Sequence, residues 1–215
     1  MMKFRYGVAV ASALALCAGL TAVPANASAN LLSNGSFEDQ QVGGNFATLS
    51  AGDPTITSWT IGGNGVDLIH DYWNAADGTQ SVDMSALSTG TLSQTVNTTV
   101  GQQYELSFWM AGNTDGGNAV KSMDTLINGN FLANSTFDVT GHSKSNMGWT
   151  EYTYDFVSTG GPTTVTFQSK EENPFGPALD NVSLKAVPEA STVITFALLM
   201  VGGMIVLRKR TVRSN

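Results

Sequence analysis

The segment Gln103-Tyr104-Glu105-Leu106-Ser107-Phe108-Trp109-Met110 alternates polar and apolar side chains over most of its length. Because successive side chains of a β-strand point to opposite faces, Tyr104, Leu106, Phe108 and Met110 share one face. The pattern predicts a strand with that face in a hydrophobic core, and with Trp109 on the opposite face.

Similar segments recur along the chain, whereas the helical period is nearly absent. The other strand candidates alternate, or are rich in β-branched and aromatic residues, over residues 57–61, 66–69, 81–84, 91–96, 123–127, 131–139, 149–156, 163–169 and 178–184. Glycine-rich turns separate them, and Asn128-Gly129 between two candidates is a clear hairpin signal. We therefore expect an all-β fold, an antiparallel sandwich.

Both ends of the chain carry signals of export. Lys3 and Arg5 precede an apolar run over residues 8–20 and a group of small residues, so residues 1–29 are expected to be a signal peptide. An apolar run over residues 193–207 precedes a basic cluster at residues 208–210. It predicts a transmembrane helix, near or below the roughly 17 to 25 residues of a stable span, with its basic end in the cytoplasm.

The composition between these two segments limits the function. Four lysines stand there against all seventeen acidic residues of the chain, a formal charge of −13. Nucleic acids and anionic membrane surfaces attract basic patches, so neither is an expected partner. The one cysteine, Cys17, lies in the expected signal peptide, and the exported part has no thiol for a disulfide or a catalytic site.

The tail from Val187 to Arg210 resembles the PEP-CTERM sorting signal of Gram-negative bacteria. Val187, Pro188 and Glu189 match the sorting motif, and Ala190 stands where that family usually has a second proline. The resemblance implies residues 187–215 as a sorting signal that a membrane transpeptidase, exosortase, processes. The inner membrane would then be at least a transient partner. The alternative is a plain C-terminal anchor.

Six segments of the exported part, taken in order, resemble one family. They are residues 30–38, 56–60, 77–84, 92–95, 101–113 and 175–184. Together they are similar to the choice-of-anchor C domain, which is close to a plant cell-wall domain family of unknown function. Both resemble the galactose-binding-like jelly roll of many carbohydrate-binding modules. The resemblance implies one jelly-roll β-sandwich over residues 30–186.

The opening and closing motifs of this domain suggest a metal site. The first and last strands of a jelly roll can lie side by side, which would bring Glu38 close to Asp180. Two buried carboxylates repel each other unless a cation neutralises them. The resemblance implies a structural calcium ion held by Glu38 and Asp180, with the Ser36 carbonyl as a third ligand. The alternative is a pair of solvated acids.

Four residues are candidates for binding a ligand. Tyr72 and Trp73 lie in an expected loop, and aromatic loop residues beside polar groups suit ligand binding. Trp109, on the outward face of its strand, could stack against a sugar ring or be covered by a loop. Asn113, after the same strand, adds an amide.

Signs of catalysis are few. His70 and His142 are the only histidines, and the sequence has no nucleophile elbow, phosphate loop or dinucleotide fingerprint. The prediction is therefore a non-enzymatic module, exported to the cell surface or extracellular matrix, that binds polysaccharide. One alternative is a structural matrix or protein-interaction domain without a sugar ligand, and a glycoside hydrolase is a third.

Overall fold

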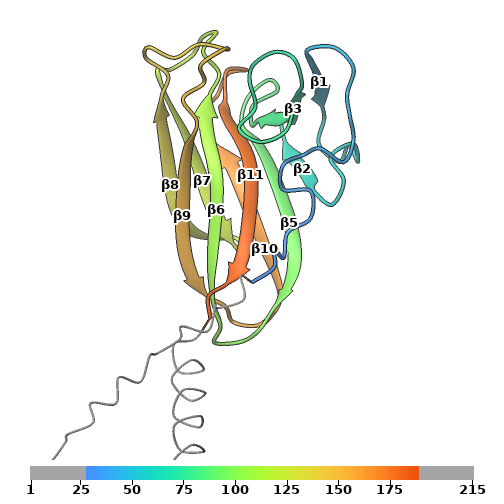
Figure 1. The fold of residues 1–215 in the computed structure, drawn as a ribbon, viewed down its shortest axis with the longest axis vertical. Coiled ribbons are helices and arrows are strands. Elements are labelled where there is room, and N and C mark those ends of the chain that lie inside the picture. The colour runs from blue at the N-terminus through green and yellow to red at the C-terminus, as the bar shows by residue number, and fades with distance from the viewer. Residues whose placement is uncertain (1–27, 189–215) are drawn as a thin grey trace, which may run out of the picture. The chain divides into compact units, whose positions relative to one another are not determined.

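Two antiparallel β-sheets and no helix make up the part of the chain that the computed structural model describes, residues 28–188 (Figure 1). The six-stranded sheet has the order β1 (Phe46–Leu49), β3 (Val66–Ile69), β4 (Ser81–Asp83), β11 (Pro177–Ala186), β6 (Gln103–Gly112), β9 (Thr150–Val157). The five-stranded sheet has the order β2 (Thr60–Gly63), β5 (Gly90–Thr98), β10 (Gly161–Ser169), β7 (Val120–Ile127), β8 (Asn130–Asp138). The predicted antiparallel jelly-roll sandwich is confirmed.

The core lies between the two sheets and follows the predicted alternation. Tyr104, Leu106, Phe108 and Met110 of β6 are buried, whereas Glu105, between the first two in the sequence, is exposed. The ring of Phe108 meets the ring of Phe167 from the opposite sheet edge to face, with centroids 5.0 Å apart. Such aromatic contacts add to the stabilisation from apolar burial alone.

The N-terminal segment of the domain lies beside the last strand, as predicted. The Leu31 amide donates to the Leu184 carbonyl at 2.8 Å, and the Val182 amide donates to the Gly35 carbonyl at 2.8 Å. The register between β11 and β6 shifts between Asp180 and Ser183, which marks a bulge. Residues 30–38 therefore pass along β11 next to this bulge.

Ten strands of the structure overlap predicted ones, with ends that differ by up to three residues. The sequence prediction missed β1, a four-residue strand that pairs only with β3. Its alternation is too short to stand out from the surrounding loop.

The expected signal peptide and the apolar run over residues 193–207 lie outside the described residues. Within residues 28–188, no helix is long and apolar enough to cross a membrane. Val187, the first residue of the expected sorting motif, is held to the start of β6, because its amide donates to the Gln103 carbonyl at 2.9 Å.

Candidate functional site

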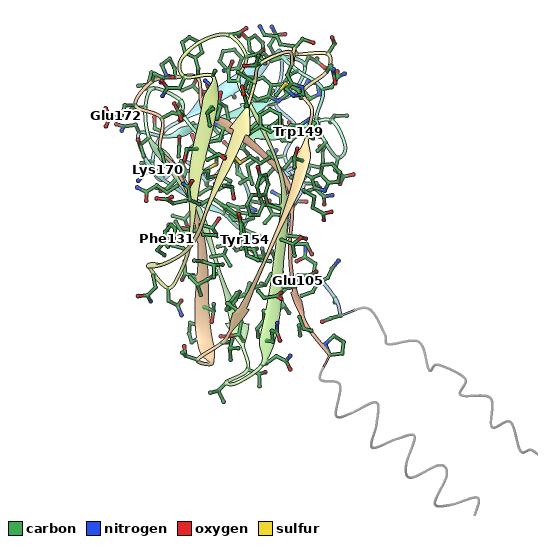
Figure 2. All side chains as sticks on the ribbon, turned by 90° about the vertical axis from the view of Figure 1, so that its left-hand side faces the viewer. Glu105, Phe131, Trp149, Tyr154, Lys170 and Glu172 are labelled. Carbon is green, nitrogen blue, oxygen red and sulfur yellow. The ribbon has the colours of Figure 1, made fainter. Side chains whose placement is uncertain are left out.

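A pocket of about 240 Å³ opens where the outer edges of the two sheets meet. One wall comes from the hairpin between β7 and β8, and the other from the end of β9 and the turn into β10. Figure 2 looks onto this side of the molecule, with Phe131 labelled on β8 and Tyr154 on β9. The apolar lining residues are Ile127, Phe131, Leu132, Phe156 and Val157. The polar ones are Asn128, Asn130, Ser158, Thr159 and Thr163.

The pocket lies where a row of aromatic residues along β9 changes from tyrosine to phenylalanine. Tyr152, Tyr154 and Phe156 alternate along β9 and face the opposite sheet. The two tyrosine hydroxyls reach β8: Tyr152 donates to the Thr136 carbonyl, and Tyr154 exchanges a hydrogen bond with the Ser135 hydroxyl at 2.9 Å. Phe156 has no hydroxyl to bridge the two strands, and the sheet edges are open beside it.

The hairpin on the other wall has the geometry its sequence predicted. Asn128 and Gly129 have φ angles of 51° and 75°, as a two-residue hairpin turn requires. The register then shifts, so that Thr125 pairs with Ala133 but Leu126 pairs with Phe131. Leu132 is the extra residue of this bulge. Bulges redirect side chains next to them, and the Phe131 side chain is 64% exposed at the pocket mouth.

The lining combines aromatic surface with neutral hydrogen-bonding groups. The Asn128 side-chain oxygen accepts from the Thr164 amide, and the Asn130 side-chain nitrogen donates to the Ile127 and Asn128 carbonyls. Within residues 28–188 no partner is provided for the Asn128 amide nitrogen, the Asn130 amide oxygen or the Thr159 hydroxyl. The lining has no charged side chain. This chemistry suits a neutral ring with one apolar face and several hydroxyl groups.

The structure contradicts the prediction that Trp73 contacts a ligand. Its side chain is only 4% exposed, and its indole N–H donates to the Ser81 hydroxyl at 2.8 Å. A buried indole that finds its one hydrogen-bond partner inside the fold is a core residue. Asn113 is likewise buried, at 6% exposure, and its amide nitrogen donates to Asp83 at 2.9 Å. Neither side chain presents a surface to a ligand.

Tyr72 lies at the other end of the sandwich, in a contact that joins three loops. The Lys144 ammonium lies 3.7 Å from the centre of its ring, and the Tyr72 hydroxyl donates to Asp115. Lys144 and Asp115 also form an ion pair at 2.9 Å. One face of the Tyr72 ring is therefore covered by a cation, and the cluster fixes the loops together.

Trp109 is half-buried on the outward face of β6, opposite Asp180 on one side and Glu151 on the other. The structure does not bring it close to the pocket: Trp109 pairs with Glu151 near the start of β9, and the pocket lies at the other end of that strand. Trp109 therefore stays a predicted ligand contact that is separate from the pocket.

The two acids of the expected calcium site both contact the loop over residues 76–80, where they accept hydrogen bonds from backbone amides. Asp180 accepts from the amides of Ala76 and Asp77 at 2.8 and 2.9 Å. Glu38 accepts from the amides of Thr79 and Gln80 at 2.7 and 2.6 Å.

The second oxygen of Glu38 accepts from Thr79 and Gln41 side chains, so that all its acceptor positions are in use. Calcium needs six to eight oxygen ligands. Within residues 28–188, no group of three or more histidine, cysteine, aspartate or glutamate side chains is placed to hold a metal ion. As they lie, Glu38, Asp180 and the half-buried Ser36 do not fit a shared calcium ion.

We therefore expect excess EDTA to leave the melting temperature of the domain unchanged. A ligand that binds only the native state raises stability by mass action, so removing a structural calcium ion would lower it. Differential scanning calorimetry with and without EDTA makes the comparison. A melting temperature that falls on chelation and recovers with added calcium would contradict the hydrogen-bond arrangement described above.

Sequence reasoning missed Phe131 and Phe156 as site residues. Phe131 directly follows the Asn128-Gly129-Asn130 turn, and an aromatic residue beside a polar hairpin turn was the one available signal. Its importance depends on β8 and β9 being edge strands on the same side of the sandwich, which is a property of the whole fold.

Comparison with known proteins gives one sequence relative. Halomucin of Haloquadratum walsbyi is 30% identical to this chain over 165 residues, which are 72% of the chain. The chain spans only 2% of the length of that relative.

Several solved carbohydrate-binding modules have a similar fold at low identity. A family 35 module from Clostridium thermocellum is 18% identical, with a TM-score of 0.46 over 66% of this chain and 98% of its own. The TmCBM61 module, solved with β-1,4-galactotriose, is 20% identical, with a TM-score of 0.48 over 74% of this chain and all of its own. A CBM22 xylan-binding domain from Paenibacillus barcinonensis is 18% identical, with a TM-score of 0.47 over 76% and 98%.

A family model matches residues 30–185, nearly the whole sandwich. The chain belongs to the DUF642 family of proteins of unknown function.

Proposed function

We propose that this domain is a non-catalytic module that binds a neutral polysaccharide in the pocket between β8 and β9. The observation that carries the proposal is the lining of that pocket. An exposed phenylalanine ring stands beside amide and hydroxyl groups that have free hydrogen-bonding capacity, and no charge is present. A pyranose ring has an apolar face for the aromatic ring and hydroxyl groups for the amides.

The charge of the domain favours a neutral chain over an acidic one. The exported part carries a formal charge of −13, and polyanions such as pectate or alginate would be repelled. The pocket, at about 240 Å³, is smaller than a typical site for a drug-sized ligand. It suits one or two sugar units of a longer chain, so affinity per site is expected to be weak and to rise when several contacts are presented.

Substituting Phe131 is expected to reduce binding by about two- to tenfold. Aromatic contacts are worth about 0.5 to 1.5 kcal/mol beyond area burial, and about 1.4 kcal/mol is a factor of ten. Affinity electrophoresis on cellulose derivatives, xylan, galactan, pectate and alginate compares the wild type with Phe131→Ala. Phe46→Ala is the matched control, because Phe46 is also exposed, at 45%, but lies on β1, away from the pocket.

Retention on a neutral polysaccharide that Phe131→Ala weakens and Phe46→Ala leaves unchanged would support the proposal. Equal losses in both variants, or retention only on the acidic polymers, would contradict it. Retention on none of the polymers would favour the alternative of a structural matrix or protein-interaction domain.

The proposal includes export to the cell surface or extracellular matrix, with the choice-of-anchor C and PEP-CTERM resemblances as its support. If Val187-Pro188-Glu189 is a sorting motif, exosortase cuts the chain near Glu189 and releases it from the inner membrane. Intact-mass spectrometry of surface and membrane fractions tests this in a host with exosortase and in a deletion strain. We expect protein that ends near residue 189 only where the enzyme is present. Protein that retains Asn215 in both strains would mean a plain anchor.

A further inference from the structure

Asparagine followed by glycine is a reactive pair of residues, and the chain has three such pairs: Asn34-Gly35, Asn64-Gly65 and Asn128-Gly129. The backbone nitrogen of the glycine can attack the side-chain carbonyl carbon of the asparagine, because the two residues are consecutive and the attack closes a five-membered ring. Glycine favours this step, since it has no side chain and its backbone turns freely. Which pair reacts depends on how firmly the fold holds the reacting groups.

The first pair is held by its side chain and by its packing. The Asn34 side-chain nitrogen donates to the Thr57 carbonyl at 3.1 Å, and the side-chain oxygen accepts from the Asp39 amide at 3.2 Å. A Cβ atom at Gly35 would lie 2.1 Å from the Val182 carbonyl oxygen, so the backbone there has no room to turn. Attack on Asn34 would require several of these contacts to break.

In the second pair, the attacking nitrogen is already in use. The Gly65 amide donates to the Gly62 carbonyl at 3.2 Å. Gly65 is buried, and a Cβ atom there would lie 2.4 Å from the Leu49 carbonyl oxygen. Attack on Asn64 would therefore require a hydrogen bond to break and a packed backbone to move.

The third pair has none of these restraints. Asn128 and Gly129 are exposed, and a Cβ atom at Gly129 has no neighbour within 4 Å. Within residues 28–188 the Gly129 amide donates to no acceptor, and neither does the side-chain nitrogen of Asn128, which is the leaving group. The Asn128 side-chain oxygen accepts from the Thr164 amide at 2.8 Å. A donor at this position stabilises the negative charge that forms on the oxygen during the attack.

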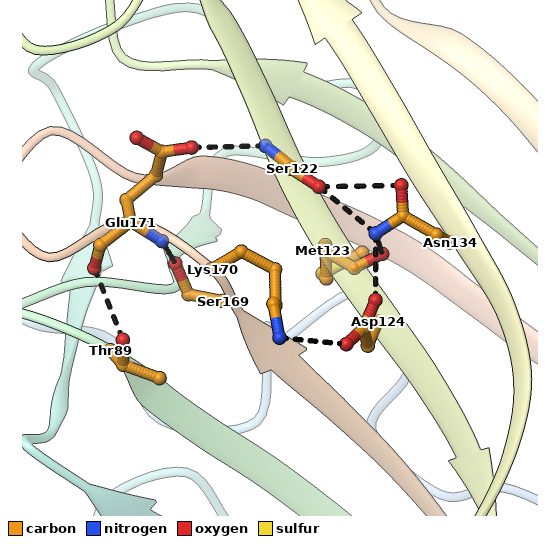
Figure 3. Close-up of polar contacts among 8 residues, drawn as sticks. All are labelled: Thr89, Ser122, Met123, Asp124, Asn134, Ser169, Lys170 and Glu171. Carbon is orange, nitrogen blue, oxygen red and sulfur yellow. Dashed lines mark hydrogen bonds and ion pairs between the residues drawn. The ribbon is translucent and has the colours of Figure 1, made fainter.

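A neighbouring asparagine on β8 is exposed but held. The Asn134 side-chain nitrogen donates to Asp124 at 2.7 Å and to the Ser122 hydroxyl at 2.9 Å, as Figure 3 shows. The residue after it is Ser135, whose side chain hinders the approach of the backbone nitrogen. Asn134 is therefore an internal control that lies close to Asn128 in the sequence.

We propose that Asn128 is the site of a spontaneous modification to aspartate or isoaspartate. The Gly129 nitrogen attacks Cγ of Asn128, the N–Cγ bond forms, the Cγ–Nδ2 bond breaks, and the amide proton leaves with Nδ2 as ammonia. A solvent water molecule then opens the ring. Breaking the new N–Cγ bond gives aspartate, and breaking the bond from the Gly129 nitrogen to the backbone carbonyl carbon gives isoaspartate. The exchange of ammonia for water accounts for all atoms without an oxidant or a reductant.

The effect of this modification on the pocket rests on the proposed function. Asn128 lines the pocket, whose lining has no charged side chain. Either product adds a negative charge there, and isoaspartate also lengthens the backbone of the turn that leads to Phe131. Aspartate can still accept from the Thr164 amide, so the hairpin is expected to stay folded. The modified domain would bind a neutral polysaccharide more weakly, and binding would decline as the protein ages.

Mass spectrometry of the full chain in detergent, incubated at pH 6 and at pH 9, tests the modification. Trypsin releases residues 122–144 as one peptide, because Lys121 and Lys144 flank it. At pH 9 this peptide should gain about 1 Da, and fragmentation should place the gain at residue 128. The reaction should be slower at pH 6, because the attacking nitrogen must lose its proton. In Asn128→Gln the ring would be larger, and the gain should be absent.

A chain kept denatured under the same conditions is the reference. There the three Asn-Gly pairs should react at similar rates, because only the fold distinguishes them. In the folded chain, a gain of mass at Asn34, Asn64 or Asn134 that equals or precedes the gain at Asn128 would overturn the proposal. The absence of any gain at Asn128 would also overturn it.

Affinity electrophoresis of the modified protein tests the effect on the pocket separately. Retention on a neutral polysaccharide should fall as the modified fraction rises. Unchanged retention after complete modification would overturn the effect on binding, whereas the mass measurement alone decides whether Asn128 is the modified residue.

Discussion

The domain is expected to be more stable at pH 5 than at pH 8, the reverse of the usual acid sensitivity. The cause is a set of buried acids. Burial raises the pKa of Asp83 and of Asp180 from 3.8 to about 7 each, and it also raises the pKa of Asp67, the cross-strand partner of Asp83. A carboxyl whose pKa is higher in the folded state stabilises the fold while it is protonated.

The sign and size follow from proton linkage. The stability from Asp83 and Asp180 is fully present below about pH 4 and is lost as the pH rises through about 7. Once ionised, each carboxyl lowers the free energy of unfolding by about 4 kcal/mol. Roughly 2 to 3 kcal/mol of this loss occurs between pH 5 and pH 8. Acids whose pKa is lowered, such as Glu38 and Asp115, act in the opposite direction as the pH falls through those lowered values.

Urea unfolding at pH 5 and pH 8 measures this difference for residues 30–186. In Asp83→Asn the side chain cannot ionise, so the difference in unfolding free energy between pH 5 and pH 8 should shrink by roughly 2 to 3 kcal/mol. This holds even if the substitution itself changes the stability by an equal amount at both pH values. Glu172→Gln, which removes one exposed negative charge, should leave the difference unchanged. A wild-type domain that is equally stable at both pH values would show that these carboxyls are ionised in the core.

Gly35→Ala is expected to destabilise the domain by about 3 kcal/mol or more, which lowers the melting temperature by about 6 to 12 °C for a domain of this size. A Cβ atom at Gly35 would lie 2.1 Å from the Val182 carbonyl oxygen. The clash is with backbone, so no side-chain rotation relieves it. The same two residues are joined by the hydrogen bond from the Val182 amide to the Gly35 carbonyl, which would have to lengthen or break.

Gly43→Ala is the matched control, because a Cβ atom at Gly43 has no neighbour within 4 Å. Thermal unfolding followed by circular dichroism should give this variant a melting temperature close to that of the wild type. If Gly35→Ala unfolds at the same temperature as Gly43→Ala, residues 30–38 do not form the tight contact with β11 that the structure assigns to them.

The long strands could be predicted because their signal is local. The alternation in β6 fixes which residues face the core, and the Asn128-Gly129 turn fixes the hairpin. The meeting of the first and last motifs could also be predicted from the resemblance to a known fold. β1 could not, because four residues at a sheet edge carry too little periodicity.

The site depended on contacts that no local pattern encodes. The loop that carries Trp73 turns its indole toward Ser81 of β4. The presence of an aromatic residue in a loop does not predict whether its side chain points outward or into the core. The pocket depends on three separate features: a bulge in β8, a phenylalanine at the end of the β9 tyrosine row, and the adjacency of two edge strands. Each feature is visible in the sequence only once the strand order is known.

The most direct test of the polysaccharide-binding pocket is a titration of ¹⁵N-labelled protein with a soluble neutral oligosaccharide from the polymer that retains the domain best. The proposed site predicts amide shifts concentrated at residues 127–132 and 156–159, which saturate with added ligand and weaken in Phe131→Ala. Shifts concentrated around Tyr72 or Trp109 would place the ligand elsewhere on the domain. A spectrum unchanged by every neutral oligosaccharide would contradict the account.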